Sequence, residues 1–332
     1  MSRLKALVIG YGSIGKRHTT NLMNYKPKPE ISICTKNKEV LPLEKKGIKI
    51  YSTITDAIKQ KHDVVLICNE TNLHVKTAIK FAKKNYHIFL EKPMSDSLQN
   101  IPSLIRMIKN RKLITMVGCN MRFHSGIKLM KQLIDKKEIG RVVSVSVENG
   151  SFMPDWHPWE NYRISYAAQK KLGGGVVLTQ IHEIDYLHWF FGEAIETYSF
   201  TGKLSNLEID VEDYASCILK FKNKVIAEVH LDYFQKPSTR NCKIIGTKGQ
   251  IRWDWENNHV QLYKNKQKKW MTKKIEKKFD SNQMYVDELN YFLNCIMTKK
   301  TPMNSIIHAL EPQKISLAIK KSSKIGKKVR IK

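Results

Sequence analysis

The sequence predicts an α/β protein in two parts: a doubly wound parallel sheet, then an α+β domain with a large open, mainly antiparallel sheet. Three observations predict it. Up to about Cys119, short apolar segments alternate with segments of helical periodicity. Beyond that residue, most apolar segments follow one another with turn-forming residues between them. The 332 residues fit about two domains, and 42% of them are apolar, enough for two cores.

In the N-terminal part, a short apolar run indicates each buried strand, and periodic apolar positions indicate each helix. We expect strands at 4–9, 31–35, 63–68, 87–90 and 114–117. We expect helices from the glycines after the first strand to about 25, and at 54–61, 72–85 and 98–110. Strands that alternate with helices imply βαβ units and a parallel sheet.

After Cys119 the pattern changes. We expect helices near 126–136, 178–191, 283–298 and 304–323, and an aromatic, glycine-rich loop over 150–175. Strands are predicted at 142–147, 197–203, 213–221, 225–234, 240–246, 250–255 and 259–264. We therefore expect domains at 1–120 and 121–332, with the helix at 304–323 packing back on the first.

The chain is strongly basic, with 58 Lys and Arg against 30 Asp and Glu and a formal net charge of +28. Only ten of these are arginines; the 48 lysines are spread along the chain and are densest at 264–278 and 320–332. Nucleic-acid binders usually concentrate charge on one face and add arginines and stacking aromatics. We therefore expect a solvated lysine-rich surface and no nucleic-acid partner, while a preference for anionic small molecules stays open.

No stretch approaches ~18 consecutive apolar residues, and the N-terminus lacks a signal-peptide pattern, so we expect no membrane partner. No two of the cysteines form a CxxC pair, which favours buried thiols over disulfides or zinc. They are Cys34, Cys68, Cys119, Cys217, Cys242 and Cys295. The expected location is the cytoplasm. No HExxH spacing occurs, and we expect no metal.

A glycine-rich motif, Gly10-Tyr11-Gly12-Ser13-Ile14-Gly15, follows the first predicted strand and opens a helix. In that context the pattern indicates dinucleotide binding, with the pyrophosphate at the helix N-terminus. A purely structural glycine turn is the alternative. Arg17 and His18 lie one turn into this helix and face either the phosphates or solvent.

The ends of the next strands carry further candidates for cofactor binding. Where an acidic residue would bind the ribose of NAD, the sequence has Thr35-Lys36-Asn37, which favours NADP unless Lys36 is incidental. Four polar residues after the third strand are further candidates for cofactor binding: Asn69, Thr71, Asn72 and His74. Two of them, Thr71 and Asn72, could instead serve only as N-caps of the next helix.

Glu91-Lys92-Pro93 ends the fourth strand at the same sheet edge. A desolvated lysine there could move protons or polarise a hydroxyl, and an ordinary surface lysine is the alternative. Together with the glycine motif, Gly173-Gly174-Gly175 and His182-Glu183-Ile184-Asp185, this tripeptide resembles the glucose–fructose oxidoreductase / inositol dehydrogenase / rhizopine catabolism (Gfo/Idh/MocA) family over essentially the whole chain.

The resemblance implies a Rossmann domain, which binds NAD or NADP, and an α+β domain whose open sheet carries the substrate pocket. It also implies a homo-oligomer, a dimer or tetramer, formed through that sheet. The implied reaction transfers hydride between the nicotinamide and a hydroxyl or carbonyl carbon of a sugar, polyol or nucleotide sugar. The alternative is a non-catalytic dinucleotide-binding sensor on the same fold.

By the same resemblance, Lys92 is the lysine of the Glu-Lys-Pro motif, with Glu91 beside it at the cofactor, and His182 is the proton-transferring histidine. Many members carry an Asp where this chain has Thr179, which leaves Thr179 and Gln180 as hydrogen-bonding neighbours. Asp185, one turn after His182, either orients the imidazole or is a surface acid.

Four further residues are predicted to bind substrate. Arg122 follows the fifth strand at the domain junction; it suits an anionic or polyhydroxyl ligand, or forms a structural ion pair. The loop before the triple glycine is aromatic and cationic, which suits sugar rings and phosphates, although a buried loop or subunit contact would look the same. Its candidates are Trp156, Tyr162 and Arg163.

Overall fold

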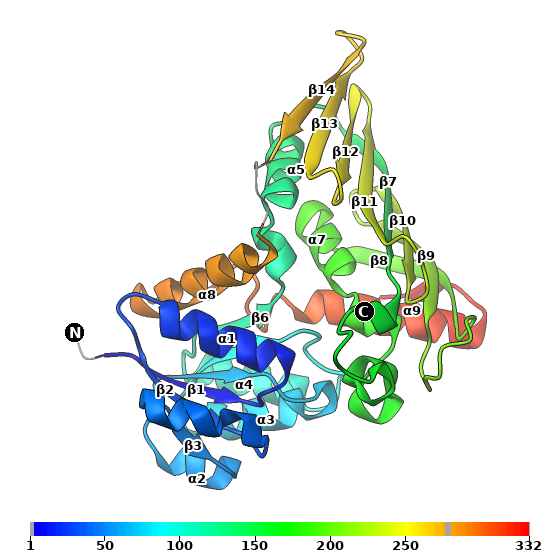
Figure 1. Ribbon diagram of the computed structural model, residues 1–332. Coiled ribbons are helices and arrows are strands. Elements are labelled where there is room, and N and C mark those ends of the chain that lie inside the picture. The colour runs from blue at the N-terminus through cyan, green and yellow to red at the C-terminus, as the bar shows by residue number, and fades with distance from the viewer. Residues whose placement is uncertain (1–2, 276–279, 332) are drawn as a thin grey trace. The chain divides into compact units, whose positions relative to one another are not determined.

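The computed structural model describes residues 3–275 and 280–331, which form two compact units (Figure 1). The first unit contains the described residues up to Cys119 together with Asn282–Leu310, and the second contains those of Asn120–Ser281 and from Glu311 onward. The chain first passes between the units one residue from the predicted boundary. The return of residues 282–310 to the first unit was not predicted. Part of the lysine-rich run at 264–278 lies outside the described residues.

The first unit is built on a parallel sheet in the order β3-β2-β1-β4-β5-β6. Its strands are β1 (Lys5–Ile9), β2 (Glu30–Cys34), β3 (Lys49–Tyr51), β4 (Val64–Ile67), β5 (His87–Glu91) and β6 (Thr115–Gly118). The strand order reverses between β1 and β4, the point at which open α/β sheets bind ligands beyond the carboxyl ends of their strands.

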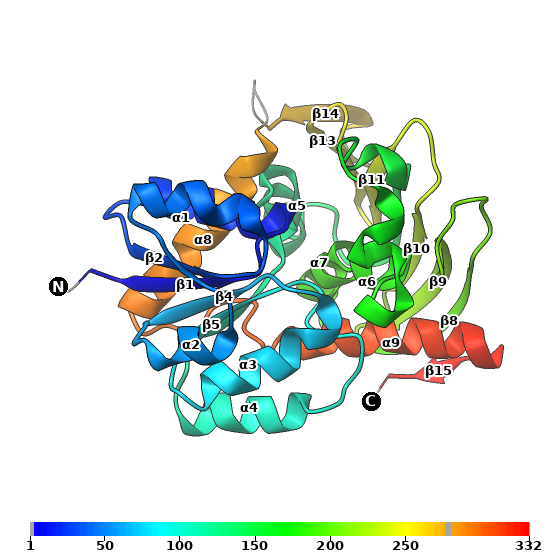
Figure 2. The same cartoon turned by 60° about the horizontal axis from the view of Figure 1, so that its bottom comes forward.

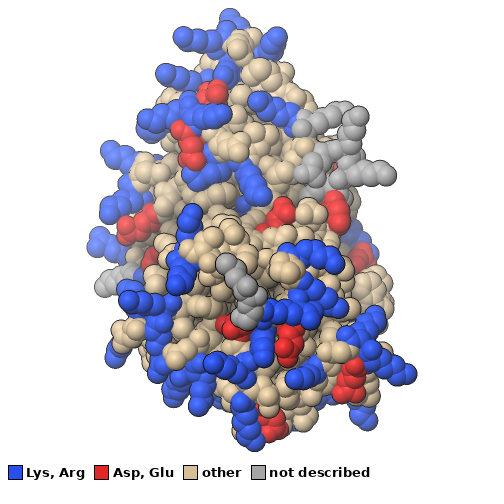
Figure 3. Space-filling view, turned by 90° about the vertical axis from the view of Figure 1, so that its left-hand side faces the viewer, with Lys and Arg blue, Asp and Glu red and all other residues tan. Residues whose placement is uncertain are grey.

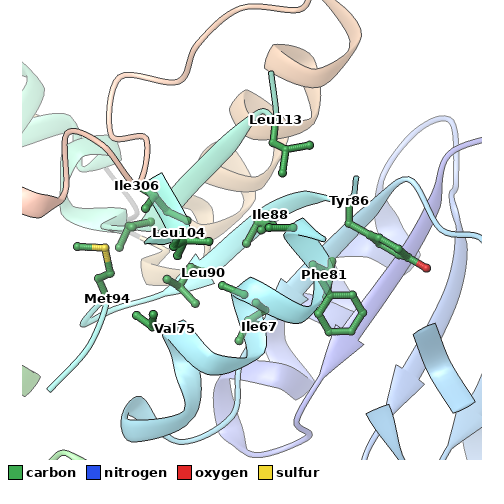
Figure 4. Close-up of a cluster of buried hydrophobic side chains, with 14 of the residues drawn as sticks. Ile67, Val75, Phe81, Tyr86, Ile88, Leu90, Met94, Leu104, Leu113 and Ile306 are labelled. Atoms are coloured by element: carbon green, nitrogen blue, oxygen red, sulfur yellow. The ribbon is translucent and has the colours of Figure 1, made fainter. Parts of the chain in front are cut away.

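Helices cover both faces of this sheet (Figures 1 and 2). They are α1 (Ser13–Asn24), α2 (Ile54–Lys59), α3 (His74–Ala82), α4 (Ile101–Asn110) and α8 (Ser281–Met297), with 3-10 segments η1 (Lys38–Lys46) and η2 (Thr71–Leu73). On one face, α3 and α4 bury a continuous apolar cluster against β4 and β5 (Figure 4). Its members include Ile67, Val75, Phe81, Ile88, Leu90, Leu104 and Ile306.

On the other face lie α1 and α8. Phe292 of α8 packs edge-on against Phe89 of β5, with ring centroids 5.5 Å apart, and Asn282 donates a hydrogen bond to Asn21 of α1 at 3.1 Å. The helix that returns to the first unit is therefore α8. The helix predicted at 304–323 is observed as α9 (Leu310–Ile325), which belongs almost entirely to the second unit, and its packing on the first domain stays a prediction.

The second unit is built on a mixed sheet in the order β14-β13-β12-β11-β7-β10-β9-β8-β15. All neighbouring strands pair antiparallel except β7 and β10, which are parallel. The strands are β7 (Val142–Gly150), β8 (Ala194–Gly202), β9 (Tyr214–Phe221), β10 (Ile226–Asp232), β11 (Thr239–Gly246), β12 (Gly249–Asp254), β13 (His259–Lys264), β14 (Lys269–Lys274) and β15 (Val329–Arg330).

One face of this sheet is covered by helices. Besides α9 they are α5 (Ser125–Asp135), α6 (Val176–Thr179) and α7 (His182–Phe191), with 3-10 segments η3 (Asn120–Phe123), η4 (Met153–Asp155), η5 (Tyr162–Ile164), η6 (Tyr166–Ala168) and η7 (Lys170–Leu172). Ser199 of β8 donates to the Ile319 carbonyl of α9 at 2.6 Å. The prediction of a single helix at 178–191 is wrong, because the helix is interrupted between the end of α6 at Thr179 and the start of α7 at His182.

Two arginines, the buried Arg122 and the half-buried Arg240, hold the first turn of α7. Arg122 of η3 donates from Nε and Nη2 to the two carboxylate oxygens of Asp185, both at 2.7 Å. Arg240 of β11 places Nε 2.7 Å and Nη2 2.6 Å from Glu183 Oε1, while Asn149 of β7 donates to Glu183 Oε2 at 3.1 Å. Glu183 and Asp185 are both fully buried. These pairs fix α7 against η3 and against the sheet.

Lysines and arginines are spread over the face shown in Figure 3, with acidic residues among them. None of the described helices has the length and apolar character needed to cross a bilayer. All six cysteines are buried thiols. Burial raises the pKa of Cys34 to about 11, which keeps this thiol protonated at neutral pH.

Asp185→Asn should strongly destabilise the protein, because it removes the buried carboxylate that pairs with the buried Arg122 guanidinium through two hydrogen bonds. Breaking a buried pair in this way costs about 3–5 kcal/mol. Urea denaturation would measure the free energy of unfolding, and the double variant Arg122→Met/Asp185→Leu should regain much of the loss. The matched control is Glu208→Gln, which breaks an equally well-formed but exposed pair with Arg163 and should have little effect. Equal losses in the two single variants would contradict the prediction.

Candidate functional site

The glycine motif forms a tight turn between β1 and α1. Gly10 has φ +90°, and a Cβ there would lie 2.7 Å from the Cys68 carbonyl oxygen. A Cβ on Gly15 would lie 2.3 Å from the Gly10 carbonyl oxygen. By contrast, a Cβ on Gly12 would have no heavy atom within 4 Å beyond its chain neighbours. The first and third glycines thus permit close backbone packing, and the second leaves space for a ligand.

The N-terminus of α1 faces that space without a side chain capping it. Gly12 is the N-cap residue, no side chain caps the helix, and no acidic residue lies in its first turn. Ser13 is exposed, and Ile14 is half-buried. The first N–H groups of a helix attract anions through their unsatisfied hydrogen bonds and the helix dipole. The residues therefore fit the pyrophosphate of a dinucleotide.

The loop after β2 is tied to the glycine motif. Asn37 Nδ2 donates to the Tyr11 carbonyl at 3.2 Å, and Thr35 Oγ1 accepts from the Asn37 backbone N–H at 3.1 Å. Lys36 is exposed. Beyond it, Glu39 forms an ion pair with Lys16 of α1. The segment predicted to meet the adenosine ribose thus presents a hydroxyl and a lysine beside the glycine turn.

The residues after β4 are mostly engaged within the unit. The ring nitrogens of His74 lie 2.8 Å from the Pro93 carbonyl and 2.9 Å from the Asn69 carbonyl. Burial lowers the pKa of this histidine. His74 therefore links the ends of β4 and β5, and its contact with the cofactor stays a prediction. Thr71 is buried and Asn72 half-buried, and neither caps a helix, because the N-cap residues are Glu70 and Leu73. Asn69 remains half-buried and donates to Thr77.

At the end of β5, Glu91 and Lys92 have different surroundings. Glu91 is buried: its Oε1 lies 2.6 Å from Nε2 of the buried His18, and its Oε2 accepts from the Lys92 backbone N–H at 3.1 Å. The side chains of His18 and Glu91 therefore meet each other, and their contact with the cofactor stays a prediction. Lys92 is half-buried at the carboxyl edge of the sheet.

A tyrosine that the sequence did not single out joins this edge. Tyr285 of α8 lies under Arg17, whose guanidinium carbon is 4.4 Å from the ring centroid. Burial raises the pKa of Tyr285, while the positive charges of Arg17 and Lys92 act to lower it. Arg17 thus stacks on an internal ring. Tyr285 comes from a helix far along the chain, and no motif marks it.

In the second unit, the triple glycine sets the course of the chain into α6. Gly173 and Gly175 have φ +84° and +106°. A Cβ on Gly174 would lie 2.4 Å from the Tyr166 carbonyl oxygen, and one on Gly175 would lie 2.4 Å from a Glu212 carboxylate oxygen. The positive φ of Gly173 and Gly175 and the close Tyr166 carbonyl at Gly174 therefore favour glycine at all three positions.

His182 is the first residue of α7 and is half-buried. The two predicted neighbours before it lie at the end of β10. Gln180 donates to the Asp232 carbonyl at 3.0 Å, and Thr179 lies beside the hydroxyl of the buried Tyr233. Thr179 and Gln180 therefore fix the break between α6 and α7. Tyr233 is a second site neighbour that the sequence did not reveal.

Two predicted site residues near His182 form a buried ion pair with each other. Both carboxylate oxygens of Asp185 accept hydrogen bonds from Arg122, so Asp185 is not a surface acid. The same contact is the structural ion pair that was the alternative for Arg122, which is 2% exposed, and the roles of both residues towards substrate and His182 stay predictions. The sequence does not show that the side chains of Arg122 and Asp185 are both buried.

The loop candidates lie around an open pocket in the second unit. The cavity has a volume of about 320 Å³ and is lined by Phe152, Pro154, Tyr162, Ser205, Asn206, Leu207 and Phe234. Arg163 stacks on the Tyr162 ring at 4.8 Å and pairs with Glu208 through Nε and Nη2 at 2.7 and 2.8 Å. Trp156 donates to Ser151 at 2.9 Å and packs against Tyr233. Tyr162 thus lines a cavity, whereas Arg163 and Trp156 are engaged with protein groups.

Comparison with known proteins matches both parts of the chain to one family. Residues 4–119 match an oxidoreductase family's NAD-binding Rossmann fold, and residues 131–331 match the C-terminal alpha/beta domain of the same family, Gfo/Idh/MocA. The chain is 27% identical over 315 residues to myo-inositol 2-dehydrogenase of Thermotoga maritima, with 89% of each chain covered.

Two solved structures have the same fold. A levoglucosan dehydrogenase in complex with NADH matches with a TM-score of 0.90, covering 100% of both chains at 20% identity. The WlbA dehydrogenase of Bordetella pertussis, in complex with NADH and UDP-GlcNAcA, matches with a TM-score of 0.84 at 20% identity, covering 100% of this chain and 99% of that one. The sheet order, the glycine turn and both matched domains agree: the chain belongs to the Gfo/Idh/MocA family of oxidoreductases.

Proposed function

We propose that this protein is an NAD(P)-dependent dehydrogenase or reductase that acts on a hydroxyl or carbonyl carbon of a sugar or polyol. The glycine turn carries the proposal: it leaves space at Gly12 and an uncapped helix N-terminus at the reversal point of a parallel sheet. Membership of an oxidoreductase family favours this function over a non-catalytic sensor.

When bound, the nicotinamide dinucleotide supplies hydride exchange. The backbone of the turn at Gly10–Gly15 holds its pyrophosphate. The Lys92 ammonium stabilises negative charge that develops on the substrate oxygen, and His182 takes or returns the hydroxyl proton. Glu91 and Glu183, the buried neighbours of these residues in the sequence, support them through His18 and Arg240.

The substrate is proposed to be a neutral polyhydroxy compound. Arg122 and Arg163, the two arginines that suggested an anionic ligand, both form two-pronged pairs with carboxylates. A phosphate or carboxylate would have to compete with these groups. The family relative that acts on myo-inositol, by its name, supports the neutral class.

For the cofactor, the NAD-binding domain supports NAD(H), and we propose in addition a preference for NADP. Residues 35–37 offer a hydroxyl, a lysine and an amide, without the carboxylate that would bind a ribose 2′-hydroxyl. The exposed Lys36 would pair with the 2′-phosphate.

A homo-oligomer is proposed to form through the uncovered face of the second unit's sheet. On β8 and β9 this face carries three exposed apolar side chains, Tyr198, Phe200 and Ile218, at 39%, 64% and 50% exposure. Tyr198 lies opposite Ile218, and Tyr198 packs against Phe200 at 5.4 Å. Such adjoining apolar groups mark interfaces more often than solvated surface. The six buried thiols suit a reducing, cytoplasmic location, which we also propose.

Lys92→Met should lower kcat about 10²- to 10⁴-fold and leave the Kd for NADH unchanged, because it removes a charge needed only during the reaction. Absorbance at 340 nm with a panel of sugars and polyols measures kcat, and NADH fluorescence measures binding. Lys80→Met, at an exposed position on α3, is the matched control and should change neither value. Retained turnover in the Lys92 variant would contradict the assigned role.

Lys36→Ala should weaken NADP⁺ binding about tenfold, since a charge-assisted contact to the 2′-phosphate is lost, and should leave NAD⁺ binding unchanged. Isothermal titration calorimetry with the two dinucleotides measures both affinities. Lys38→Ala, two residues further on at an exposed position, is the control. A wild-type protein that binds NAD⁺ more tightly, with no response to Lys36→Ala, would overturn the NADP preference.

The double variant Phe200→Glu/Ile218→Glu should shift the protein to the monomer, because charges placed on the uncovered sheet face oppose its burial. Light scattering after size-exclusion chromatography measures the mass. Leu41→Glu replaces an apolar side chain of similar exposure, 52%, in the first unit and should leave the mass unchanged. If the wild-type protein is monomeric, the proposed interface is wrong.

A further inference from the structure

The aromatic pocket of the second unit has no part in the chemistry assigned to Lys92 and His182. Three of its lining residues, Phe152, Tyr162 and Phe234, are half-buried aromatic side chains contributed by three separate segments. Its volume of about 320 Å³ lies at the lower end of the range of small-molecule sites. Aromatic walls with few polar groups are typical of such sites.

Each wall of the pocket is fixed from behind. The Tyr162 ring lies under Arg163, whose guanidinium is held by Glu208, and the Tyr162 hydroxyl accepts from the Glu208 backbone N–H at 3.3 Å. The Phe234 ring is stacked on Tyr214, with an interplanar angle of 11°. The rings are therefore ordered before any ligand arrives, which lowers the entropy cost of binding.

The remaining walls are fixed in the same way. Lys236 lies 4.0 Å from the Phe152 ring centroid and is paired with Asp155 at 2.9 Å. The segment that contributes Ser205 is anchored by the buried Asp213, which accepts from the Leu204 and Ser205 N–H groups and from the Ser205 hydroxyl at 2.7, 3.1 and 2.6 Å.

The pocket adjoins the segment that supports the helix of His182. Asp232 accepts from Gln180 through its carbonyl, and Tyr233 lies beside Thr179. The next residue, Phe234, lines the pocket. Alternate residues here turn in opposite directions, Tyr233 into the core of the unit and Phe234 into the cavity. The pocket and His182 therefore share one rigid support.

Most of the charged groups around the pocket are already engaged, which favours an uncharged occupant. Arg163 and Lys236, which flank its rings, have carboxylate partners in Glu208 and Asp155, and the Lys203 ammonium donates to the Ser205 carbonyl at 3.3 Å. A nucleoside diphosphate bound here would have to draw its phosphate contacts from these engaged cations. A sugar ring presents apolar C–H faces to aromatic rings and hydroxyls to a polar group such as the exposed Asn206.

We propose that this pocket is a subsite for a second, uncharged pyranose ring of the substrate, so that the preferred substrate is a glycoside or disaccharide. The inference rests on the proposed function in one respect: the first ring of the substrate is the ring that reacts. Binding of the second ring is a property of the second unit's own residues.

Phe234→Ala and the pocket-filling variant Asn206→Trp should each weaken disaccharide binding about tenfold and leave monosaccharide binding unchanged. Saturation-transfer difference NMR on the full-length protein measures both, with cellobiose, maltose and lactose against glucose and galactose as probes. Trp159→Ala is the matched control, because Trp159 belongs to the same loop, is 76% exposed and does not line the pocket. Its disaccharide affinity should equal that of the wild type.

Several outcomes overturn the subsite. These are equal affinity for both probe classes in the wild type, no response to either pocket variant, or tighter binding of UDP than of the disaccharides with the same sensitivity to Phe234→Ala. Because the NMR experiment needs no turnover, the two proposals fail separately. Disaccharide binding without any change in absorbance at 340 nm would contradict the proposed reaction and support the subsite. Turnover of a monosaccharide without disaccharide binding in the pocket would support the reaction and contradict the subsite.

Discussion

A charge removed from water has to be paired, and in this protein that requirement governs the residues beside both candidate catalytic groups. Glu91 precedes Lys92 and is buried against His18; Glu183 follows His182 and is buried against Arg240. Leaving any of these carboxylates without a partner would cost several kcal/mol. The backbone at Lys92 and at His182 therefore cannot move freely, because moving it would pull a buried carboxylate away from its partner.

The same requirement explains how the chain uses its few arginines. Lysines supply most of the net charge of +28 and are spread over the surface (Figure 3). Arginine has a planar fork that binds a carboxylate with two hydrogen bonds, and this geometry suits internal pairs. Arg122 and Arg240 hold α7 in this way, and Arg17 stacks on Tyr285. The basic composition is thus mainly a property of the solvated surface, while the arginines discussed here serve the architecture.

Most elements could be predicted from local patterns, and the exceptions have physical reasons. The alternation of buried strands and helices in the first unit is a local signal, and it held for β1, β2, β4, β5 and β6. The strands β3, β14 and β15 were missed because they lie at sheet edges, where a strand is exposed and carries little apolar pattern. The break between α6 and α7 could not be predicted from local patterns, because Gln180 donates its hydrogen bond to Asp232, 52 positions away.

The fold class, the family resemblance and the glycine turn could be predicted from the sequence, because each depends on neighbouring residues: the periodicity of apolar positions, the order of the motifs, and the need for glycine where two backbone segments leave no room for a Cβ atom. The pairing of charged side chains depends instead on contacts between distant segments, and the tertiary structure determines it. Arg122, Asp185, His18 and Glu91 have the chemistry of site residues, but partners from distant segments use that chemistry inside the protein. The tertiary structure also brings Phe152, Tyr162 and Phe234 around one cavity. Because a pocket forms by contacts between separate segments, none of these segments carries a local sequence pattern that predicts it.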